Sequence, residues 1–350
     1  MTLQSIGWSA FFQAQLQGTH LRPCRVVSEG ADLFLVHDGD REVFAMPRGR
    51  LRTHPCFPPA VGDWVLAEAT GDSRYVVESI LERRTAIARK HAGRQQSAQI
   101  LAANVDRVVL VTSMNQDFSV RRLERYLTLV WESGATPVIV LTKSDLVEDT
   151  APFVGEAEQC ALGFPVLCIS NKTGQGLREL CSLLAAGETV VLLGSSGVGK
   201  STLTNALGGS DLRATRDIRE GDGKGRHATT DRRLLRLSSG VLLIDTPGLR
   251  EVQLWAGEAA VQQTFAEISE LAVHCRFRDC RHQGEPGCAV AAGVETGEID
   301  AGRLESLHRL RREQERLERE SDPLAASLHK RKLKQLFRAY EKQQREGKKR

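Results

Sequence analysis

Short apolar segments, separated by glycine and proline, follow one another between about residues 20 and 85. Clear examples are residues 25–27, 33–36 and 64–68. This spacing is typical of a small all-β domain, and we expect a five-stranded barrel of the oligonucleotide-binding (OB) type. Because periodicity does not fix topology, an irregular β extension without a ligand is the alternative.

Beyond a polar, basic connection at residues 83–99, apolar strands alternate with longer helical stretches. The alternation predicts an α/β domain whose parallel sheet is covered by helices on both faces. The expected strands are residues 105–111, 137–141, 165–169, 189–193 and 241–244, and helices are expected at residues 120–132 and 176–186.

From about residue 258 the pattern is helical again, interrupted by a cluster of cysteine and histidine. Leu304, Leu307 and Leu310 form an apolar stripe at helical spacing, which favours a core face over a partner-binding face. These shifts in pattern predict three domains, at residues 1–85, 86–255 and 256–350.

Composition and charge narrow the class of protein. The 350 residues, 41% of them hydrophobic, suffice for two or three domains with buried cores. The formal charge is only +4, but residues 330–350 carry ten Lys or Arg against two Glu. This basic arm suits an anionic partner, or alternatively is a solvated helix face. No apolar run reaches the roughly 18 residues of a membrane span, and residues 1–10 lack a secretory signal, so we expect a soluble cytoplasmic protein.

Residues 194–201 match the pattern G-x-x-x-x-G-K-[ST] and lie between a predicted strand and a predicted helix. In such a loop the backbone N–H groups point at the β-phosphate of a nucleotide, and the helix N-terminus adds partial positive charge. Lys200 would reach the β- and γ-phosphate oxygens, and the Ser201 hydroxyl would bind Mg²⁺. The predicted nucleotide contacts are Gly194, Ser195, Ser196, Gly197, Val198, Gly199, Lys200, Ser201 and Thr202.

Two further segments fit the parts of such a site that sense the γ-phosphate. Asp245 opens a D-x-x-G match that ends at Gly248; the Asp would hold Mg²⁺ and the Gly N–H would meet the γ-phosphate. In the Gly-rich segment 225–230, Thr230, or failing it Thr229, could close on Mg²⁺ and the γ-phosphate. The alternative for these threonines is a hydroxyl that serves a turn.

The choice of base is predicted from residues 142–145, which end a strand and resemble the guanine-reading N-K-x-D element. Asp145 can accept hydrogen bonds from N1–H and the N2 amino group of guanine, which adenine does not offer. Thr142 replaces the usual Asn, which removes one amide tie to the phosphate loop. Residues 170–172 resemble the last guanine element, whose backbone N–H meets O6. The predicted guanine contacts are Thr142, Lys143, Ser144, Asp145, Ser170, Asn171 and Lys172.

The order of these elements differs from that of an ordinary GTPase, in which the phosphate loop comes first. Here the guanine-reading segments begin at residues 142 and 170, the phosphate loop at 194, and the γ-phosphate segments at 225 and 245. The same sheet can form if the original chain ends are joined and the chain is opened elsewhere. The sequence therefore predicts a circularly permuted P-loop GTPase domain.

Three cysteines and a histidine crowd into a short segment near the C-terminus. Cys275, Cys280, His282 and Cys288 supply three thiolates and one imidazole within 14 residues. We expect a tetrahedral Zn²⁺ site of structural role, because four protein ligands leave no open position for water. His274 is the less favoured ligand, and buried cysteines without metal are the alternative interpretation.

With these elements in place, the chain resembles the circularly permuted bacterial GTPases of the ribosome small subunit-dependent GTPase A (RsgA) family. The resemblance rests on residues 61–65 (Val-Gly-Asp-Trp-Val), 103–106 (Ala-Asn-Val-Asp), 225–227 (Gly-Arg-His) and 285–288 (Glu-Pro-Gly-Cys). It implies an OB-like barrel, a permuted GTPase domain and a C-terminal helical zinc-binding domain with a basic tail. The sequence departs from the family pattern at Ala228, where a third Thr is common, and at Thr142.

The resemblance implies a GTP hydrolase that is stimulated by the small ribosomal subunit. Such a protein binds the 30S subunit and its 16S rRNA late in assembly, hydrolyses GTP there and then leaves. The expected cofactors are GTP or GDP with Mg²⁺ and one structural Zn²⁺. We expect the chain to act as a monomer without a membrane partner.

The position after the D-x-x-G match bears on the mechanism. Leu249 stands where Ras-like proteins carry the Gln that orients the attacking water. Because leucine cannot hydrogen-bond that water, we expect slow intrinsic hydrolysis that the ribosome accelerates, with His227 supplying a polar group. The predicted catalytic residues are His227, Thr230 and Lys200, and the predicted Mg²⁺ ligands are Ser201, Thr230 and Asp245.

Two other functions compete with a ribosome-stimulated GTPase. One is an rRNA-binding assembly scaffold for which the nucleotide is only an occupancy signal. The other is a P-loop ATPase or small-molecule kinase, against which Asp145 argues.

Overall fold

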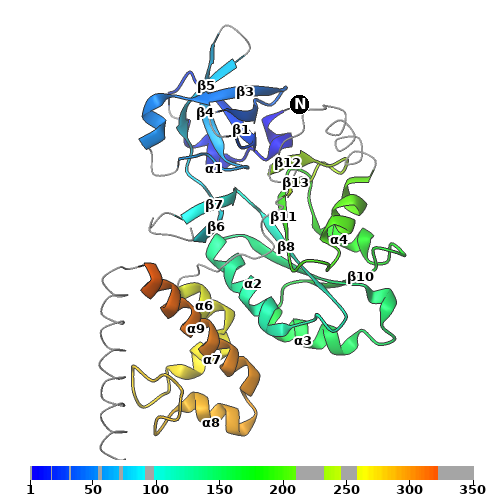
Figure 1. Cartoon of the computed structure of the whole chain (residues 1–350), viewed down its shortest axis with the longest axis vertical. Helices are drawn as coiled ribbons and strands as arrows, with labels where there is room; N and C mark the ends of the chain where they lie inside the picture. Colours follow the sequence, from blue (N-terminus) through cyan, green and yellow to red (C-terminus); the bar gives the residue numbers. More distant parts are fainter. Residues whose placement is uncertain are drawn as a thin grey trace, which may run out of the picture. The chain divides into compact units, whose positions relative to one another are not determined.

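The computed structural model describes residues 2–16, 18–30, 33–53, 57–70, 74–90, 98–209, 232–245 and 258–321. The chain divides into two compact units. Unit 1 comprises residues 1–89 and 99–264, and unit 2 comprises residues 90–98 and 265–350. Figure 1 shows the helices and strands of both units, coloured along the sequence.

Five of the described strands close a barrel in unit 1. In spatial order they are β1 (Arg22–Ser28), β2 (Phe34–His37), β3 (Glu42–Pro47), β5 (Arg74–Ile80) and β4 (Trp64–Thr70). β1 also pairs with β4, which closes the ring, and β3 pairs with β5 in parallel. The predicted OB-type barrel is therefore present. The short helix η2 (Gly49–Thr53) lies between β3 and β4 in the sequence.

Aromatic packing fixes the N-terminal segment on the barrel. This segment contains η1 (Leu3–Ile6) and α1 (Ala10–Gln13). Trp8 and Phe12 pack against the fully buried Trp64 of β4, and the ring centroids of Trp8 and Trp64 are 4.6 Å apart in an edge-to-face arrangement. Such pairs add about 0.5–1.5 kcal/mol to the free energy gained from burial alone.

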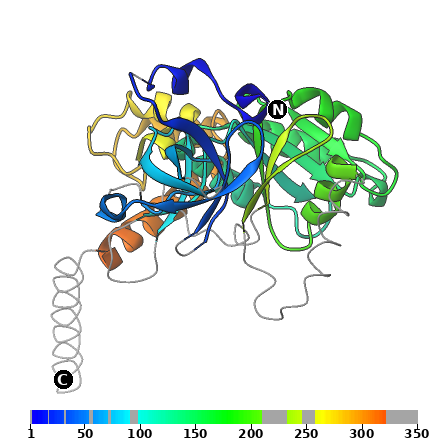
Figure 2. The same cartoon turned by 90° about the horizontal axis from the view of Figure 1, so that it is seen from above.

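The barrel continues into a second group of strands, and the two groups together form one sheet of 11 strands. In this group β10, β9, β8, β11 and β13 are parallel, and β12 is antiparallel at the end. β12 pairs with β1 at Arg233 and Ser28. In Figure 2 the yellow-green strands, which include β12, lie beside the blue barrel. The bounds are β8 (Arg107–Ser113), β9 (Thr136–Thr142), β10 (Val166–Ile169), β11 (Thr189–Leu193), β12 (Arg233–Arg236) and β13 (Leu242–Asp245).

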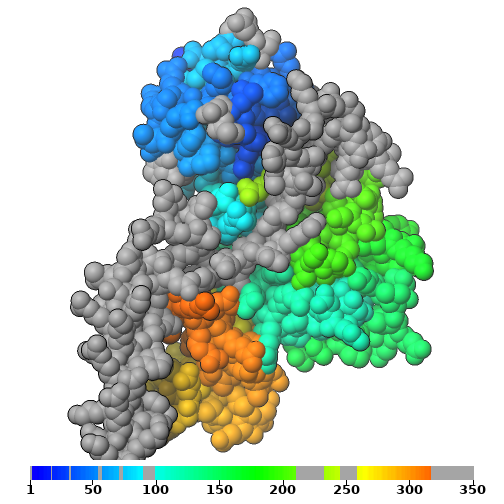
Figure 3. All heavy atoms as spheres, viewed as in Figure 1, coloured from blue at the N-terminus to red at the C-terminus, as the bar shows by residue number. Residues whose placement is uncertain are grey.

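Helices cover both faces of the parallel strands, as the sequence predicts. α2 (Val120–Ser133) and α3 (Ala151–Ala161) contact β9 on one face. On the other face, α4 (Leu177–Leu183) and the helical residues 200–209 bury leucines against the sheet. The outward surfaces of α2 and α3 form a cyan-to-green region in Figure 3. The sheet edge also carries the short helix η3 (Ser144–Leu146).

The predicted polar connection at residues 83–99 differs from the structure, because its ends form strands. β6 (Ala86–Lys90) and β7 (Ala98–Ala103) pair in a separate two-stranded sheet. Ile87 and Leu101 are each 1% exposed. Arg, Lys and Gln residues surround Ile87 and Leu101 in the sequence, so the apolar pattern does not predict these two strands.

The guanidinium of Arg25 is buried where the barrel meets the parallel strands. It donates to the carbonyl oxygens of Ile6, Gly62 and Asn104 and, at 2.7 Å, to the hydroxyl of Thr189. Arg25 is 1% exposed, and burial lowers its pKa to about 10, so it is charged at neutral pH. A buried charge persists only when its donors are satisfied. Here one side chain joins the N-terminal segment, the barrel, the residues before β8 and the start of β11.

Two segments of the family resemblance meet at the same junction. Gly62 has φ 93°, and a Cβ there would lie 2.1 Å from the carbonyl oxygen of Ala103, so this close approach requires glycine. The Ala103 N–H donates to the carbonyl oxygen of Val61 at 2.9 Å. The Asn104 side-chain amide donates to the carbonyl oxygen of Gly62 at 3.0 Å. These segments therefore build the junction of barrel and sheet.

Unit 2 is helical around its own small core. It contains α7 (Ala266–Ala272), α8 (Ala289–Thr296) and α9 (Ala301–Ser321). Leu307 and Leu310 are 2% and 6% exposed, so the predicted leucine stripe is a core face. α6 (Glu258–Thr264) belongs to unit 1 instead, where the Thr264 hydroxyl lies 3.0 Å from the Thr128 hydroxyl of α2. Within the described residues, no helix combines the length and apolar character needed to cross a membrane.

Candidate functional site

The predicted nucleotide residues gather at one edge of the parallel sheet. β9, β10 and β11 run parallel, and their carboxyl ends lead into residues 142–145, 170–172 and 194–201. Asp245 is the last residue of the neighbouring strand β13. In open α/β sheets, ligands bind in the crevice beyond the carboxyl ends of the strands. The structure thus brings together guanine-reading and phosphate-binding segments that lie up to 59 residues apart, at positions 142 to 201.

Three glycines set the path of the phosphate loop. A Cβ on Gly194 would lie 2.1 Å from the carbonyl oxygen of Val111 in β8, so the loop leaves β11 through a gap that only glycine fits. Gly197 (φ 79°) and Gly199 (φ 96°) adopt left-handed backbone conformations, which a side chain would strain. The loop therefore has the backbone freedom needed to turn its N–H groups inward.

Lys200 lies against the loop that it would serve. Its ammonium group donates to the carbonyl oxygen of Gly194 at 2.6 Å and to that of Ser195. Ser201 and Thr202 are exposed in the first turn of the following helix. Lys200 and Ser201 therefore lie at the loop for which the sequence predicts phosphate and Mg²⁺ contacts.

Two side chains tie the guanine-reading segments to the phosphate loop. The buried Thr142 hydroxyl donates to the carbonyl oxygen of Val198 at 2.6 Å. The Asn171 side-chain amide donates to the carbonyl oxygen of Gly199 at 3.3 Å. Position 142 is Thr where Asn is usual, so one side-chain amide is missing. The Thr142 hydroxyl and the Asn171 amide make the hydrogen bonds to the phosphate loop instead. The distance between base and phosphate subsites is therefore fixed by hydrogen bonds.

Asp145 presents its carboxylate to solvent at the expected base site. Its Oδ1 accepts a hydrogen bond from the Ser170 hydroxyl at 2.6 Å. That hydrogen bond holds the pKa of Asp145 below its ordinary value, and the positive charge of Lys172 acts in the same direction. Because each carboxylate oxygen has two lone pairs, acceptors remain for the N1–H and N2 groups of guanine.

The turn after β10 is held by the same serine. The Ser170 hydroxyl accepts hydrogen bonds from the backbone N–H groups of Lys172 and Thr173, at 3.3 Å and 3.1 Å. Lys143 has φ 63° and starts the η3 helix, and Ser144 is buried behind it. The Ser170 hydroxyl thus positions both the Asp145 carboxylate and the backbone N–H groups of Lys172 and Thr173.

Several predicted residues lie outside the described residues. They are His227, Thr229, Thr230, Gly248 and Leu249. Asp245 is placed at the end of β13 by its backbone. The basic arm at residues 330–350 also lies outside the described residues.

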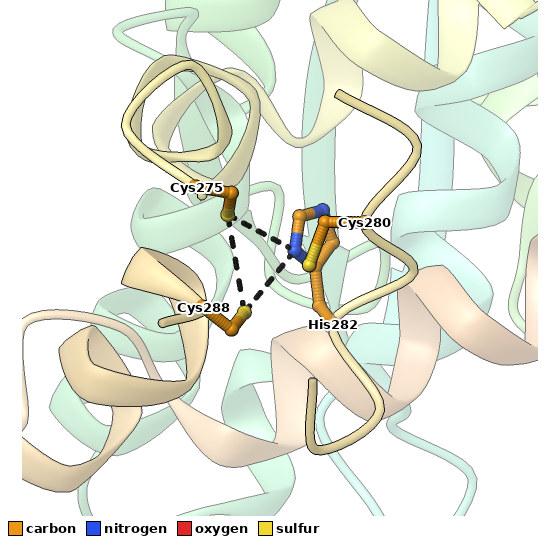
Figure 4. Close-up of side chains that lie close together, drawn as sticks. All are labelled: Cys275, Cys280, His282 and Cys288. Atoms are coloured by element: carbon orange, nitrogen blue, oxygen red, sulfur yellow. Dashed lines mark hydrogen bonds between the residues drawn. The ribbon is translucent and has the colours of Figure 1, made fainter. Parts of the chain in front are cut away.

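Unit 2 brings the predicted metal ligands together. The ligand atoms of Cys275, Cys280, His282 and Cys288 all lie within 4.8 Å of one another, and Figure 4 shows the four side chains gathered around one point. The sulfurs of Cys275 and Cys288 lie 3.6 and 3.4 Å from Nδ1 of His282, and 3.9 Å from each other. Zn–S bonds of about 2.3 Å and Zn–N bonds of about 2.0 Å give tetrahedral edges of about 3.8 and 3.5 Å. The cluster therefore fits a zinc ion, whereas His274 is exposed and outside the cluster.

Surrounding groups support the metal-binding form of these side chains. Cys288 caps α8, and its sulfur accepts a hydrogen bond from the N–H of Ala291 at 3.3 Å. Burial lowers the pKa of His282, and the positive charge of Arg311 acts in the same direction. A neutral imidazole is the form that binds a metal. The Glu285 carboxylate accepts hydrogen bonds from two backbone N–H groups of the same loop and holds its shape.

One residue at the nucleotide site is missing from the sequence-based prediction. The guanidinium of Arg122, in the first turn of α2, donates to the Ser195 hydroxyl at 2.6 Å. The sequence does contain a signal for Arg122. A basic residue in the first turn of a helix interacts unfavourably with the helix dipole, so its presence there indicates another role. The spatial approach of α2 to the loop, however, depends on the parallel pairing of β8 with β11.

Fold and site together define a circularly permuted P-loop GTPase. Counted from β11, the strand that precedes the phosphate loop, the sheet order β10-β9-β8-β11-β13-β12 reads 6-5-4-1-3-2. In an unpermuted GTPase the phosphate-loop strand comes first along the chain. Here β11 has that role in the sheet, but it follows the guanine-reading strands in the sequence. The family model described as RsgA GTPase matches residues 80–255. The chain belongs to the RsgA GTPase family and is a GTP-hydrolysing enzyme.

Individual relatives extend this match over the whole chain. The small ribosomal subunit biogenesis GTPase RsgA of Syntrophotalea carbinolica is 41% identical and covers 99% of both chains. The small ribosomal subunit biogenesis GTPase RsgA 2 of Lactiplantibacillus plantarum is 47% identical over 83% of this chain and 82% of the relative. The crystal structure of YjeQ from Thermotoga maritima has a TM-score of 0.64 at 29% identity, covering 84% of this chain and 98% of that one. YloQ, described as a circularly permuted GTPase, gives a TM-score of 0.63 at 29% identity and covers 85% and 96% of the two chains.

Exchanging Asp145 for Asn should change the base that the site prefers. The amide presents a donor where guanine needs an acceptor, so we expect GDP affinity to fall on the order of 100-fold and affinity for xanthosine diphosphate to rise. Titration calorimetry with both nucleotides measures this exchange. The matched control is Asp149→Asn, which changes an exposed acid four residues away. Unchanged GDP affinity in Asp145→Asn would show that another group reads the base.

The cysteine cluster should bind one zinc ion per chain, measurable by elemental analysis. Structural zinc contributes on the order of 10 kcal/mol to the folding of small domains. We therefore expect Cys288→Ser, or treatment with a strong chelator, to remove the metal and abolish the cooperative unfolding of unit 2. Cys181→Ser, which changes an exposed free cysteine of α4, is the control. Unit 2 that unfolds unchanged without zinc would rule out a structural metal.

Proposed function

We propose that this chain is a GTPase of small ribosomal subunit biogenesis, which binds the 30S subunit through rRNA, hydrolyses GTP there and is then released. The observation that carries the proposal is the guanine site: Asp145 is tied by Ser170, and both guanine-reading segments are tied to the phosphate loop. Two relatives that share 41% and 47% of their residues with this chain are named as GTPases of this process. The chain would act as a cytoplasmic monomer.

The outer face of the barrel supports contact with 16S rRNA. β3 alternates buried and exposed positions, which leaves Phe44 54% and Met46 46% exposed. Phe44 lies opposite the exposed Arg74 of β5. The Arg50 side chain, nearby in sequence, is 71% exposed and ion-paired with Glu78. Aromatic side chains stack on bases, and arginines contact phosphates. The basic arm at residues 330–350 would add phosphate contacts.

The chain's own residues divide the chemistry between them. Lys200 would turn from the loop carbonyls to the β- and γ-phosphate oxygens, and the loop N–H groups would hold the β-phosphate. We infer that Ser201, Thr230 and Asp245 hold Mg²⁺, which when bound neutralises charge on the phosphates. The exposed Ser201 hydroxyl fits that role. Cys275, Cys280, His282 and Cys288 would hold one structural Zn²⁺.

The attacking water needs a polar partner that Leu249 does not provide. We infer that His227 supplies it when the 30S subunit orders the segment around it, and that Thr230, or failing it Thr229, closes on the γ-phosphate. Intrinsic hydrolysis is then slow, and the nucleotide state follows the presence of the subunit. This separates the enzyme from a scaffold for which the nucleotide is only an occupancy signal.

GTP hydrolysis measured alone, with 30S subunits and with 50S subunits tests this function. We expect 30S subunits to raise turnover by at least about tenfold, because a transition-state group supplied or ordered by a partner has effects of this size or larger. 50S subunits should have no effect. Equal turnover with and without 30S subunits would leave the scaffold as the better description.

In the same assay, His227→Ala should lose the stimulation while it still binds the 30S subunit. Groups that orient or accept a proton typically contribute at least about 100-fold. The control is His274→Ala, which removes an exposed histidine outside this segment and the metal cluster and should keep the stimulation. Full stimulated turnover in His227→Ala would remove His227 from the mechanism.

A further inference from the structure

Two cations converge on one residue of the phosphate loop. Ser195 receives the Arg122 guanidinium on its hydroxyl, at 2.6 Å, and the Lys200 ammonium on its carbonyl oxygen. Arg122 also forms an ion pair with Asp117, whose Oδ1 is 3.8 Å from the guanidinium and whose side chain is 56% exposed. An exposed ion pair at that distance neutralises little of the arginine's charge. Arg122 therefore keeps most of its positive charge beside the loop, where an anion could contact it.

Arg122 occupies its place at a cost to its own helix. Ser119 caps α2 by accepting a hydrogen bond from the Arg122 N–H, so Arg122 is the third residue of the helix. The first turn contains no acidic residue. A positive charge near the positive end of the helix dipole is unfavourable, typically by about 0.3–1 kcal/mol. The contact with the phosphate loop offsets this cost and gives the arginine a role there.

The side chain can reach the same crevice as Lys200. β8 and β11 are parallel neighbours, so the residues that follow each strand, α2 on one side and the phosphate loop on the other, share one sheet edge. The side chain of Arg122 is 34% exposed, and Ser196 and Gly197, the next residues of the loop, are exposed. Arg122 approaches the loop from outside, at its first residues, whereas the loop N–H groups enclose the β-phosphate. The phosphate open to such an approach is the terminal one.

We propose that Arg122 recognises the γ-phosphate of GTP. Its guanidinium, which donates to the Ser195 hydroxyl, would turn to the γ-phosphate, where its planar donors match phosphate oxygens. Arg122 thereby makes the site distinguish GTP from GDP. Lys200 contacts both β- and γ-phosphates and cannot make this distinction alone. The inference rests on the proposed nucleotide site at residues 194–201.

The test compares binding of GDP and of a non-hydrolysable GTP analogue to the full-length protein. Arg122→Ala should lower affinity for the analogue by roughly 10- to 100-fold, as expected for a charge-assisted contact with phosphate, and change GDP affinity by less than about twofold. Arg122→Lys should restore part of the loss, because it keeps the charge but not the fork. Arg121→Ala, which changes the exposed neighbour, should leave both affinities as in the wild type.

Ser195→Ala separates recognition from simple support of the loop. If Arg122 contacts the γ-phosphate, removing the hydroxyl should leave most of the preference for the GTP analogue in place. If Arg122→Ala and Ser195→Ala weaken GDP and the analogue equally, Arg122 only holds the loop and the proposal is overturned. No change in either affinity for Arg122→Ala also overturns it. Wild-type binding of both nucleotides, measured in parallel, shows separately whether the nucleotide site itself is assigned correctly.

Discussion

The buried guanidinium of Arg25 is the constraint on which unit 1 depends. Its donors reach a carbonyl of the N-terminal segment, a carbonyl of the barrel, a carbonyl just before β8 and the hydroxyl of Thr189, the first residue of β11. Removing one partner of a buried charge typically costs about 3–5 kcal/mol, because the remaining groups are left unpaired. The barrel and the parallel sheet are therefore joined by buried hydrogen bonds of Arg25, and losing one of them leaves a buried charge or its partner unpaired.

This junction places the phosphate loop in the frame of the barrel. Thr189 starts β11, and the loop begins at Gly194, directly after that strand ends at Leu193. Beyond the loop, Thr142 and Asn171 connect it to the guanine-reading segments. Residues 184–188 connect α4 to β11, and this short link joins what would be the two chain ends of an unpermuted GTPase domain. A chain of short, directional contacts thus runs from the barrel, which carries the proposed RNA-binding surface, to the base and phosphate subsites.

Local patterns in the sequence predict the parts of the site that depend on local chemistry. The phosphate loop follows from its glycines. The predicted strand at 189–193 coincides with β11, because five apolar or β-branched residues follow Gly187 and Glu188 and end at Gly194. Asp145 and the four metal ligands follow equally from residue type and spacing. The circular order of the elements is a property of the chain and needs no coordinates.

Residues that act through long-range contacts escape such reasoning. Arg25 looks like an exposed strand residue, because arginine is seldom buried, and its acceptors are up to 164 positions away. The Asn171 side chain supplies the amide that position 142 lacks. This role is evident only from the structure, in which Asn171 donates to the carbonyl oxygen of Gly199. Arg122 shows the same limit, since only strand pairing brings α2 to the loop. The pairing of β6 with β7 is hidden in the sequence because residues 89–97, between the buried Ile87 and Leu101, are mostly polar.

The claim that barrel and nucleotide site form one body is tested most directly by hydrogen exchange, followed peptide by peptide with and without GDP. Saturation at about 100 times Kd stabilises a cooperative unit by about 2.7 kcal/mol. If the two parts open together, β4 of the barrel and β11 of the nucleotide sheet should both gain protection of this size. In Arg25→Met, β4 should exchange faster and no longer respond to GDP, whereas Arg22→Met, on the exposed side of the same strand, should behave as wild type. Protection of β11 by GDP with no change in β4 of the wild-type protein would contradict the account.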